Sequence, residues 1–126
     1  MNTDELGADC SCKVGRVAAA AGLDLDGELL ERWTGERRQS TRDLADWFNR
    51  QLLAAAIAEA GLSPKDGEVA NYYRLLTDDD VTSGDRTEIR RELQQAGVSV
   101  DTLEGRFVSH QTIHGHLTDC LGGSLS

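Results

Sequence analysis

The chain has 126 residues and a mass of 13.7 kDa, a length that suits one domain with its own core and leaves no room for a separate catalytic or regulatory domain. Its longest apolar run, residues 52–58, is far shorter than the ~20 residues that a membrane-spanning helix needs. Residues 2–5 are polar or acidic, and the N-terminal segment lacks the basic and apolar regions of a signal peptide. We therefore expect a cytoplasmic protein without a membrane span.

Acidic residues outnumber basic ones by 22 to 13, which gives a net charge of −9, and only Lys13 and Lys65 are lysines. A carboxylate-rich, lysine-poor surface suits a protein that stays hydrated in molar salt, where a Debye length of about 3 Å screens the repulsion among its charges. This composition predicts a halophilic source, with an ordinary acidic protein as the alternative. The negative charge also disfavours tight non-specific binding to nucleic acid.

The first half of the chain shows three stretches of helical periodicity. The first spans residues 14–21 and has Gly22 behind it as a C-terminal cap. The second spans residues 25–33. The third begins at Ser40 or Thr41, either of which can cap a helix, and runs to about residue 60.

The second half predicts a helix around residues 69–76, a charged helix over residues 86–96, and a last helix from residue 110 to about residue 121, capped by Ser109. Between the last two helices, we expect at most a short extended piece at residues 98–100 and a turn capped by Asp101. Five aromatic residues are expected in the core: Trp33, Trp47, Phe48, Tyr72 and Tyr73.

These patterns predict an all-α fold of six or seven helices without an internal repeat. They also predict a disordered lead over residues 1–9, a single compact helical domain over residues 10–122 and a tail over residues 123–126. Strand periodicity is otherwise absent from the sequence.

All the soft metal ligands of the sequence fall at its two ends. Cys10 and Cys12 form a Cys-x-Cys pair, and His116 and Cys120 are spaced four residues apart on the last helix, so they lie on one face about 5–6 Å apart. Three thiolates and one imidazole suit a structural zinc ion, which takes four sulfur or nitrogen ligands in a tetrahedron. We therefore predict a zinc clip that joins the N-terminus to the C-terminal helix, with His114 as a substitute ligand.

A simpler interpretation needs no metal. Cys120 is then a small buried residue, and the histidines are ordinary surface groups. A disulfide is not expected, because an intracellular location disfavours it and three cysteines cannot all pair.

The last helix also carries the pattern of a helix-turn-helix recognition helix. Ser109 would cap it, polar residues would face the bases, and Ile113 and Leu117 would anchor its back. A DNA reader needs basic residues around such a helix, yet Arg106 is the only arginine or lysine nearby. Residues 40–45 resemble the first helix of such a motif. Because the pattern is present but the basic residues are scarce, DNA binding is the alternative function.

Catalysis has little support in the sequence. The run of Asp78, Asp79 and Asp80 could hold Mg²⁺, but a solvated acidic loop or a helix start capped by Thr77 explains it better. The sequence has no glycine-rich phosphate loop and no Gly-x-Ser-x-Gly nucleophile elbow. We therefore expect no enzyme.

Six segments run in order through the chain from residue 12: Cys12–Val17, Arg32–Gly35, Leu44–Arg50, Asp66–Val69, Tyr73–Val81 and Phe107–Gln111. In these segments the sequence resembles the haloarchaeal rod-determining factor family (RdfA). The most specific of them contains Arg-Leu-Leu-Thr-Asp-Asp-Asp-Val at residues 74–81. The resemblance implies a cytoplasmic protein that is needed for the rod shape of haloarchaeal cells, with no catalytic residues to transfer.

Combined with the acidic surface, this resemblance favours a regulatory or adaptor protein that acts through a protein partner. The runner-up is a helix-turn-helix transcription regulator of cell-shape genes. A small structural subunit of a larger assembly is a third interpretation.

Overall fold

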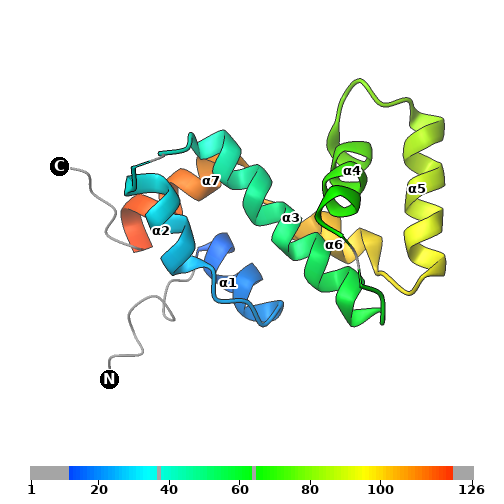
Figure 1. Cartoon of the computed structure of the whole chain (residues 1–126), viewed down its shortest axis with the longest axis horizontal. Coiled ribbons are helices and arrows are strands. Elements are labelled where there is room, and N and C mark those ends of the chain that lie inside the picture. The colour runs from blue at the N-terminus through cyan, green and yellow to red at the C-terminus, as the bar shows by residue number, and fades with distance from the viewer. Residues whose placement is uncertain (1–11, 37, 64, 121–126) are drawn as a thin grey trace. The chain divides into compact units, whose positions relative to one another are not determined.

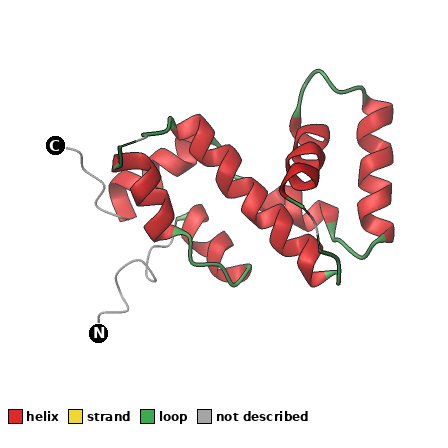
Figure 2. Ribbon diagram, in the orientation of Figure 1, coloured by secondary structure: helices red, strands yellow, loops and turns green. Residues whose placement is uncertain are grey.

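The computed structural model describes residues 12–36, 38–63 and 65–120. These residues form seven α-helices and one π-helix and contain no strand (Figures 1 and 2). The predicted all-α fold is confirmed. The chain divides into two compact units, one formed by residues 1–48 and 108–126 and the other by residues 49–107.

The first unit begins with two short helices that end where the sequence predicts. α1 (Lys13–Ala20) is followed by Gly22, whose φ of 71° is a left-handed conformation that favours glycine. α2 (Asp26–Thr34) is followed by Gly35, whose amide donates to the Glu31 carbonyl. A Cβ at residue 35 would lie 2.4 Å from that oxygen, so the position excludes any side chain.

The first unit is completed by the start of α3 (Thr41–Glu59), by α7 (His110–Gly115) and by η3, the π-helix His116–Cys120. The Ser40 hydroxyl accepts a hydrogen bond from the Asp43 amide at 3.1 Å, which confirms the predicted cap of α3. Helices α1 and α7 contact each other. The buried apolar residues of this unit are Val14, Val17, Ala18, Leu29, Trp33, Leu44, Ala45, Trp47, Phe48, Val108, Ile113 and Leu117.

Two arginines cover the buried tryptophans of the first unit. The guanidinium of Arg32 lies 4.5 Å from the ring centroid of Trp47, and that of Arg38 lies 4.7 Å from the ring of Trp33. Both distances are within the range of a cation–π contact. These arginines therefore add packing to the core.

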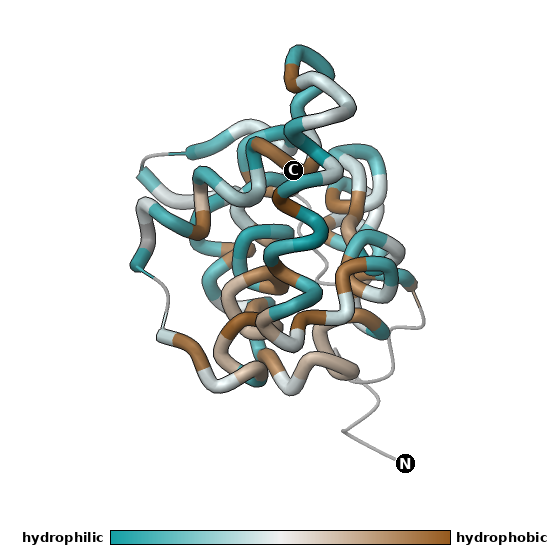
Figure 3. The backbone as a smooth tube through the Cα atoms, turned by 90° about the vertical axis from the view of Figure 1, so that its right-hand side faces the viewer, coloured by the Kyte–Doolittle hydropathy of each residue, from teal (hydrophilic) through white to brown (hydrophobic). Residues whose placement is uncertain are grey.

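The second unit contains the rest of α3, then α4 (Asp66–Thr77), α5 (Ser83–Gln95) and α6 (Val100–Arg106). Helix α5 contacts both α4 and α6. The buried apolar residues of this unit are Leu52, Leu53, Ile57, Val69, Leu76, Ile89, Leu93, Val98, Val100 and Leu103. Figure 3 shows apolar and polar segments alternating along the helices, as expected when one face of each helix is buried.

Polar contacts fix the helices of the second unit at two places. The buried Asn49 side chain donates to the Tyr73 hydroxyl at 3.0 Å, and the Tyr73 ring meets Phe107 edge to face. Elsewhere in the unit, Arg90 of α5 forms ion pairs with Asp101 and Glu104 of α6.

Two of the predicted element boundaries are wrong. The charged helix begins at Ser83, not near residue 86, because the Thr82 hydroxyl caps it by accepting the Asp85 amide. The turn predicted from Asp101 to Leu103 is instead part of α6, which begins at Val100, so only residues 98 and 99 of the predicted extended piece lie outside a helix. Val100 and Leu103, three residues apart, are both buried, so tertiary packing stabilises a helix that is too short for a clear periodicity.

None of the helices in the described ranges is both long and apolar enough to cross a lipid bilayer.

Candidate metal centre

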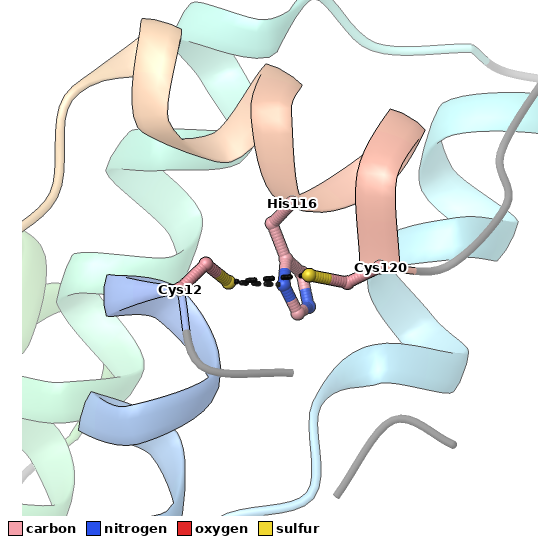
Figure 4. A group of neighbouring side chains, drawn as sticks. All are labelled: Cys12, His116 and Cys120. Carbon is pink, nitrogen blue, oxygen red and sulfur yellow. Dashed lines mark hydrogen bonds between the residues drawn. The ribbon is translucent and has the colours of Figure 1, made fainter. Parts of the chain in front are cut away.

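Three potential metal ligands from the two ends of the sequence meet in the first unit (Figure 4). Cys12, His116 and Cys120 have their ligand atoms within 4.8 Å of one another. The Sγ atom of Cys12 lies 3.0 Å from Nδ1 of His116 and 3.4 Å from Sγ of Cys120. The predicted proximity of the N-terminal segment and the C-terminal helix is therefore found in the structure.

Cys12 is positioned by the start of α1. It is the N-cap residue of that helix and has an extended backbone conformation, with φ −69° and ψ 164°. Val14 and Val17 follow it and are buried, and α1 contacts α7. The packing of α1 thus brings the Cys12 thiol to the C-terminal helix.

His116 and Cys120 are positioned by the anchoring of α7 and η3. The Ser109 hydroxyl accepts the Thr112 amide and begins α7 as predicted. Ile113 and Leu117 are fully buried, which fixes the orientation of the helix around its axis. His116 is fully buried as well.

The last turn of this helix differs from the prediction. Residues 116–120 form a π-helix and not the end of an α-helix, with His116 as its first residue and Cys120 as its last. The Thr118 hydroxyl donates to the His114 carbonyl at 3.0 Å, beside the widened turn. Short π-helical turns are frequent at functional sites.

Both ring nitrogens of His116 have polar neighbours. Nδ1 faces Cys12, and Nε2 lies 2.8 Å from Oδ1 of Asp26, the first residue of α2. Burial lowers the pKa of His116, but the hydrogen bonds to Asp26 and Cys12 outweigh it, so the pKa is raised above its usual value. The site therefore contains an imidazole that is held at both edges.

Two of the ligand separations can be compared with those of a tetrahedral zinc site. With Zn–S bonds of about 2.3 Å and Zn–N bonds of about 2.0–2.1 Å, a tetrahedron separates two sulfur ligands by about 3.8 Å and a sulfur from a nitrogen by about 3.5 Å. The observed distances of 3.4 Å and 3.0 Å are shorter than these by roughly half an ångström. Both separations would have to widen by that amount for the cluster to accept an ion.

The structure also places Cys120 in a disulfide, a bond that is not expected from the sequence. Cys12 is not the partner in this bond, because its Sγ atom lies 3.4 Å from that of Cys120, well beyond the S–S bond length of about 2.05 Å. Metal coordination requires the Cys120 thiolate, because a disulfide sulfur is not a zinc ligand of this kind. Oxidation and metal binding therefore compete for the same sulfur.

The structure does not bring the other histidines into this cluster. His114, the predicted substitute ligand, is exposed, and its ring meets Trp33 edge to face with centroids 6.0 Å apart. His110 is exposed as well. Cys10, predicted as the fourth ligand, lies outside the described residues.

Asp26 is a participant in the cluster that the sequence patterns do not reveal. It stands 90 positions from His116 in the chain. Acidic residues are common in the first turn of helices because they interact favourably with the helix dipole, so its presence there gives no sign of a second role.

The acidic run after α4 forms a local turn. The Asp78 carboxylate accepts the Asp80 amide at 2.8 Å, and Asp79 and Asp80 are exposed. Thr77 ends α4 and does not cap a helix. A solvated acidic loop fits this arrangement.

A family model and a curated relative both match the chain, and they name the same family. A model of the family described as Rod-determining factor A matches residues 12–126. Rod-determining factor A of Haloferax volcanii is 44% identical over 108 residues, which cover 83% of the chain and 50% of the relative. The chain thus spans about half the length of this curated relative. No solved structure matches the chain.

Proposed function

Because the chain belongs to the Rod-determining factor A family, we propose that it is a non-enzymatic regulatory or adaptor protein in the control of rod cell shape in haloarchaea. The family match over residues 12–126 is the observation that carries this proposal. The 44% identical relative, named as a rod-determining factor, supports the same role. The protein would act in the cytoplasm.

The proposed mode of action is binding to a protein partner. The net charge of −9 favours recognition by a complementary surface over attraction to phosphate. The large aromatic residues Trp33, Trp47 and Phe48 are buried, so they pack the core of the first unit and are not exposed for binding. Partner recognition would then depend on the polar and charged helix faces.

The proposal includes a structural zinc ion held by Cys10, Cys12, His116 and Cys120. Support comes from the convergence of Cys12, His116 and Cys120 and from a donor set of sulfur and nitrogen, which zinc prefers over the oxygen donors that suit magnesium or calcium. The ion would join α1 to η3, two helices of eight and five residues. Helices of this length are unstable alone, so the ion would stabilise their packing.

The alternative is a helix-turn-helix transcription regulator. Two observations favour it: the Ser109 cap of α7, and the exposed side chains of His110 and Gln111, which a recognition helix would direct at base edges. The scarcity of basic residues near this helix argues against it.

One experiment separates the two functions. The tagged protein is captured from its own cells at native salt, with and without nuclease. We expect a stoichiometric protein partner that survives nuclease treatment. Recovery of discrete DNA fragments, lost when Gln111→Ala and Thr112→Ala are introduced together, would overturn the adaptor proposal in favour of the regulator.

A further inference from the structure

We propose that Asp26 is a positioning residue for the metal ion, because its carboxylate accepts the Nε2–H of His116 and thereby directs Nδ1 at the ion. This inference rests on the metal site proposed above and adds to it a residue from a third helix. It assigns no direct metal bond to Asp26.

The two neighbours of His116 determine which nitrogen can bind metal. Cys12 Sγ is 3.0 Å from Nδ1, and Asp26 Oδ1 is 2.8 Å from Nε2. The two nitrogens lie on opposite edges of the imidazole ring, so the carboxylate does not face the same side of the ring as the Cys12 sulfur. Nδ1 is therefore the nitrogen that faces Cys12, and Nε2 is the nitrogen bound by the carboxylate.

The carboxylate also selects the tautomer that metal binding needs. A neutral imidazole carries one proton, and the nitrogen that binds the metal must offer its lone pair. A carboxylate at Nε2 keeps the proton there and leaves the lone pair on Nδ1. Metal-bound histidines usually donate their other N–H to such a partner, and loss of the partner typically weakens metal binding 10- to 100-fold.

The packing of α2 fixes the position of Asp26 beside His116. It is the first residue of α2, and that helix is anchored in the core of the first unit by Leu29 and Trp33, which are 0% and 9% exposed. The Asp26 side chain is itself 35% exposed, whereas His116 is fully buried. A carboxylate that stabilised only the helix dipole would not need to contact a buried imidazole.

The test is a metal titration of the full-length, reduced, metal-free chain at native salt. Zinc affinity is measured by competition with a chromophoric chelator, and cobalt(II) absorption reports the ligand geometry. The variants are Asp26→Ala, Asp26→Asn and the control Asp24→Ala, which removes an exposed carboxylate just before α2. Circular dichroism establishes that each variant is folded at the temperature of the titration.

We expect Asp26→Ala to weaken zinc binding 10- to 100-fold and to alter the cobalt d–d bands, because the His116 ring loses its orientation. Asp26→Asn, which keeps a neutral acceptor, should fall between Asp26→Ala and the wild type, and Asp24→Ala should match the wild type. Equal affinity and equal cobalt spectra for the wild type and Asp26→Ala would overturn the positioning role while leaving the metal site in place. A wild-type chain that binds neither metal would overturn both.

Discussion

Cys12 and His116 are 104 positions apart in the sequence, yet Sγ of one lies 3.0 Å from Nδ1 of the other. Both are positioned by packed helices: Cys12 by α1, and His116 by the C-terminal helix that contacts α1. The cluster therefore requires the first unit to be folded, and its properties can be used to test that fold.

Metal content is the first prediction. Chain purified in reductant is expected to contain about one zinc per molecule by elemental analysis. If free zinc is 100 times the dissociation constant, binding adds about 2.7 kcal/mol to the free energy of unfolding. Chelation should then lower the melting temperature by roughly 10 °C.

The control for chelation is Cys12→Ser, which removes one ligand. This variant should contain little zinc, and a chelator should leave its melting temperature unchanged. Absence of zinc from the reduced wild-type chain would refute the proposed ion.

The two histidines near the end of the chain should behave differently. His116→Gln is expected to abolish zinc binding, because the fully buried His116 belongs to the same cluster as both cysteines. His114→Gln should retain the zinc, since His114 is exposed and contacts Trp33. Zinc content after identical purification is the measurement, and a loss of zinc in His114→Gln would show that the ligand set is misassigned.

In the metal-free protein, the contribution of His116 to stability should fall as the pH rises. The folded-state pKa of His116 lies above its unfolded value of 6.5, so the pair of protonated His116 and Asp26 stabilises the fold fully below pH 6.5. This contribution is lost as the pH rises through the higher folded pKa. Denaturant unfolding of wild type and Asp26→Asn, without metal, should give a difference in unfolding free energy that shrinks with increasing pH.

Asp24→Asn is the matched control for this pH series, and it should follow the wild type at every pH. Zinc has the opposite pH dependence, because it binds the neutral imidazole. The stability added by zinc should therefore increase with pH. A difference between wild type and Asp26→Asn that grew with pH in the absence of metal would contradict the assignment.

In the second unit, Arg90→Ala should cost about 1 kcal/mol of unfolding free energy, because Arg90 pairs with both Asp101 and Glu104 of α6. The figure is small because Arg90 is 29% exposed and Asp101 is 82% exposed, so water and salt screen the pairs. Arg91→Ala, at the exposed neighbouring position, should have almost no effect. Denaturant unfolding at low and high salt measures both variants, and equal losses would exclude a specific role for the Arg90 pairs.

Local sequence signals predicted most of the helices because capping and burial are local properties. Ser40 and Ser109 cap the helices that they precede, and Gly22 follows the end of α1 in a left-handed conformation. Helix α6 was missed because seven residues carry too little periodicity. Its burial of Val100 and its ion pairs with Arg90 depend on contacts that the sequence does not display.

The candidate site was predictable only in part. The rarity of cysteine and histidine pointed to Cys12, His116 and Cys120, which the structure brings together. The sequence could not decide fully between His114 and His116, because helix orientation determines which of them is buried. It gave no sign of Asp26, whose contact joins residues 90 positions apart. Zinc binding and the role of Cys10 as the fourth ligand remain predictions.

The separation of the ligands also determines how a bound ion would act on folding. An unfolded chain must close a loop of about 100 residues to bring residues 12 and 116 together, at an entropic cost of about 4–5 kcal/mol. Zinc would therefore discriminate strongly between the folded and unfolded chain, unlike an ion whose ligands are adjacent in sequence. Residues 49–107 all lie within that loop. When the whole chain unfolds, these residues unfold together with the loss of the ion. Zinc would therefore add to the free energy of complete unfolding, although none of residues 49–107 is a ligand.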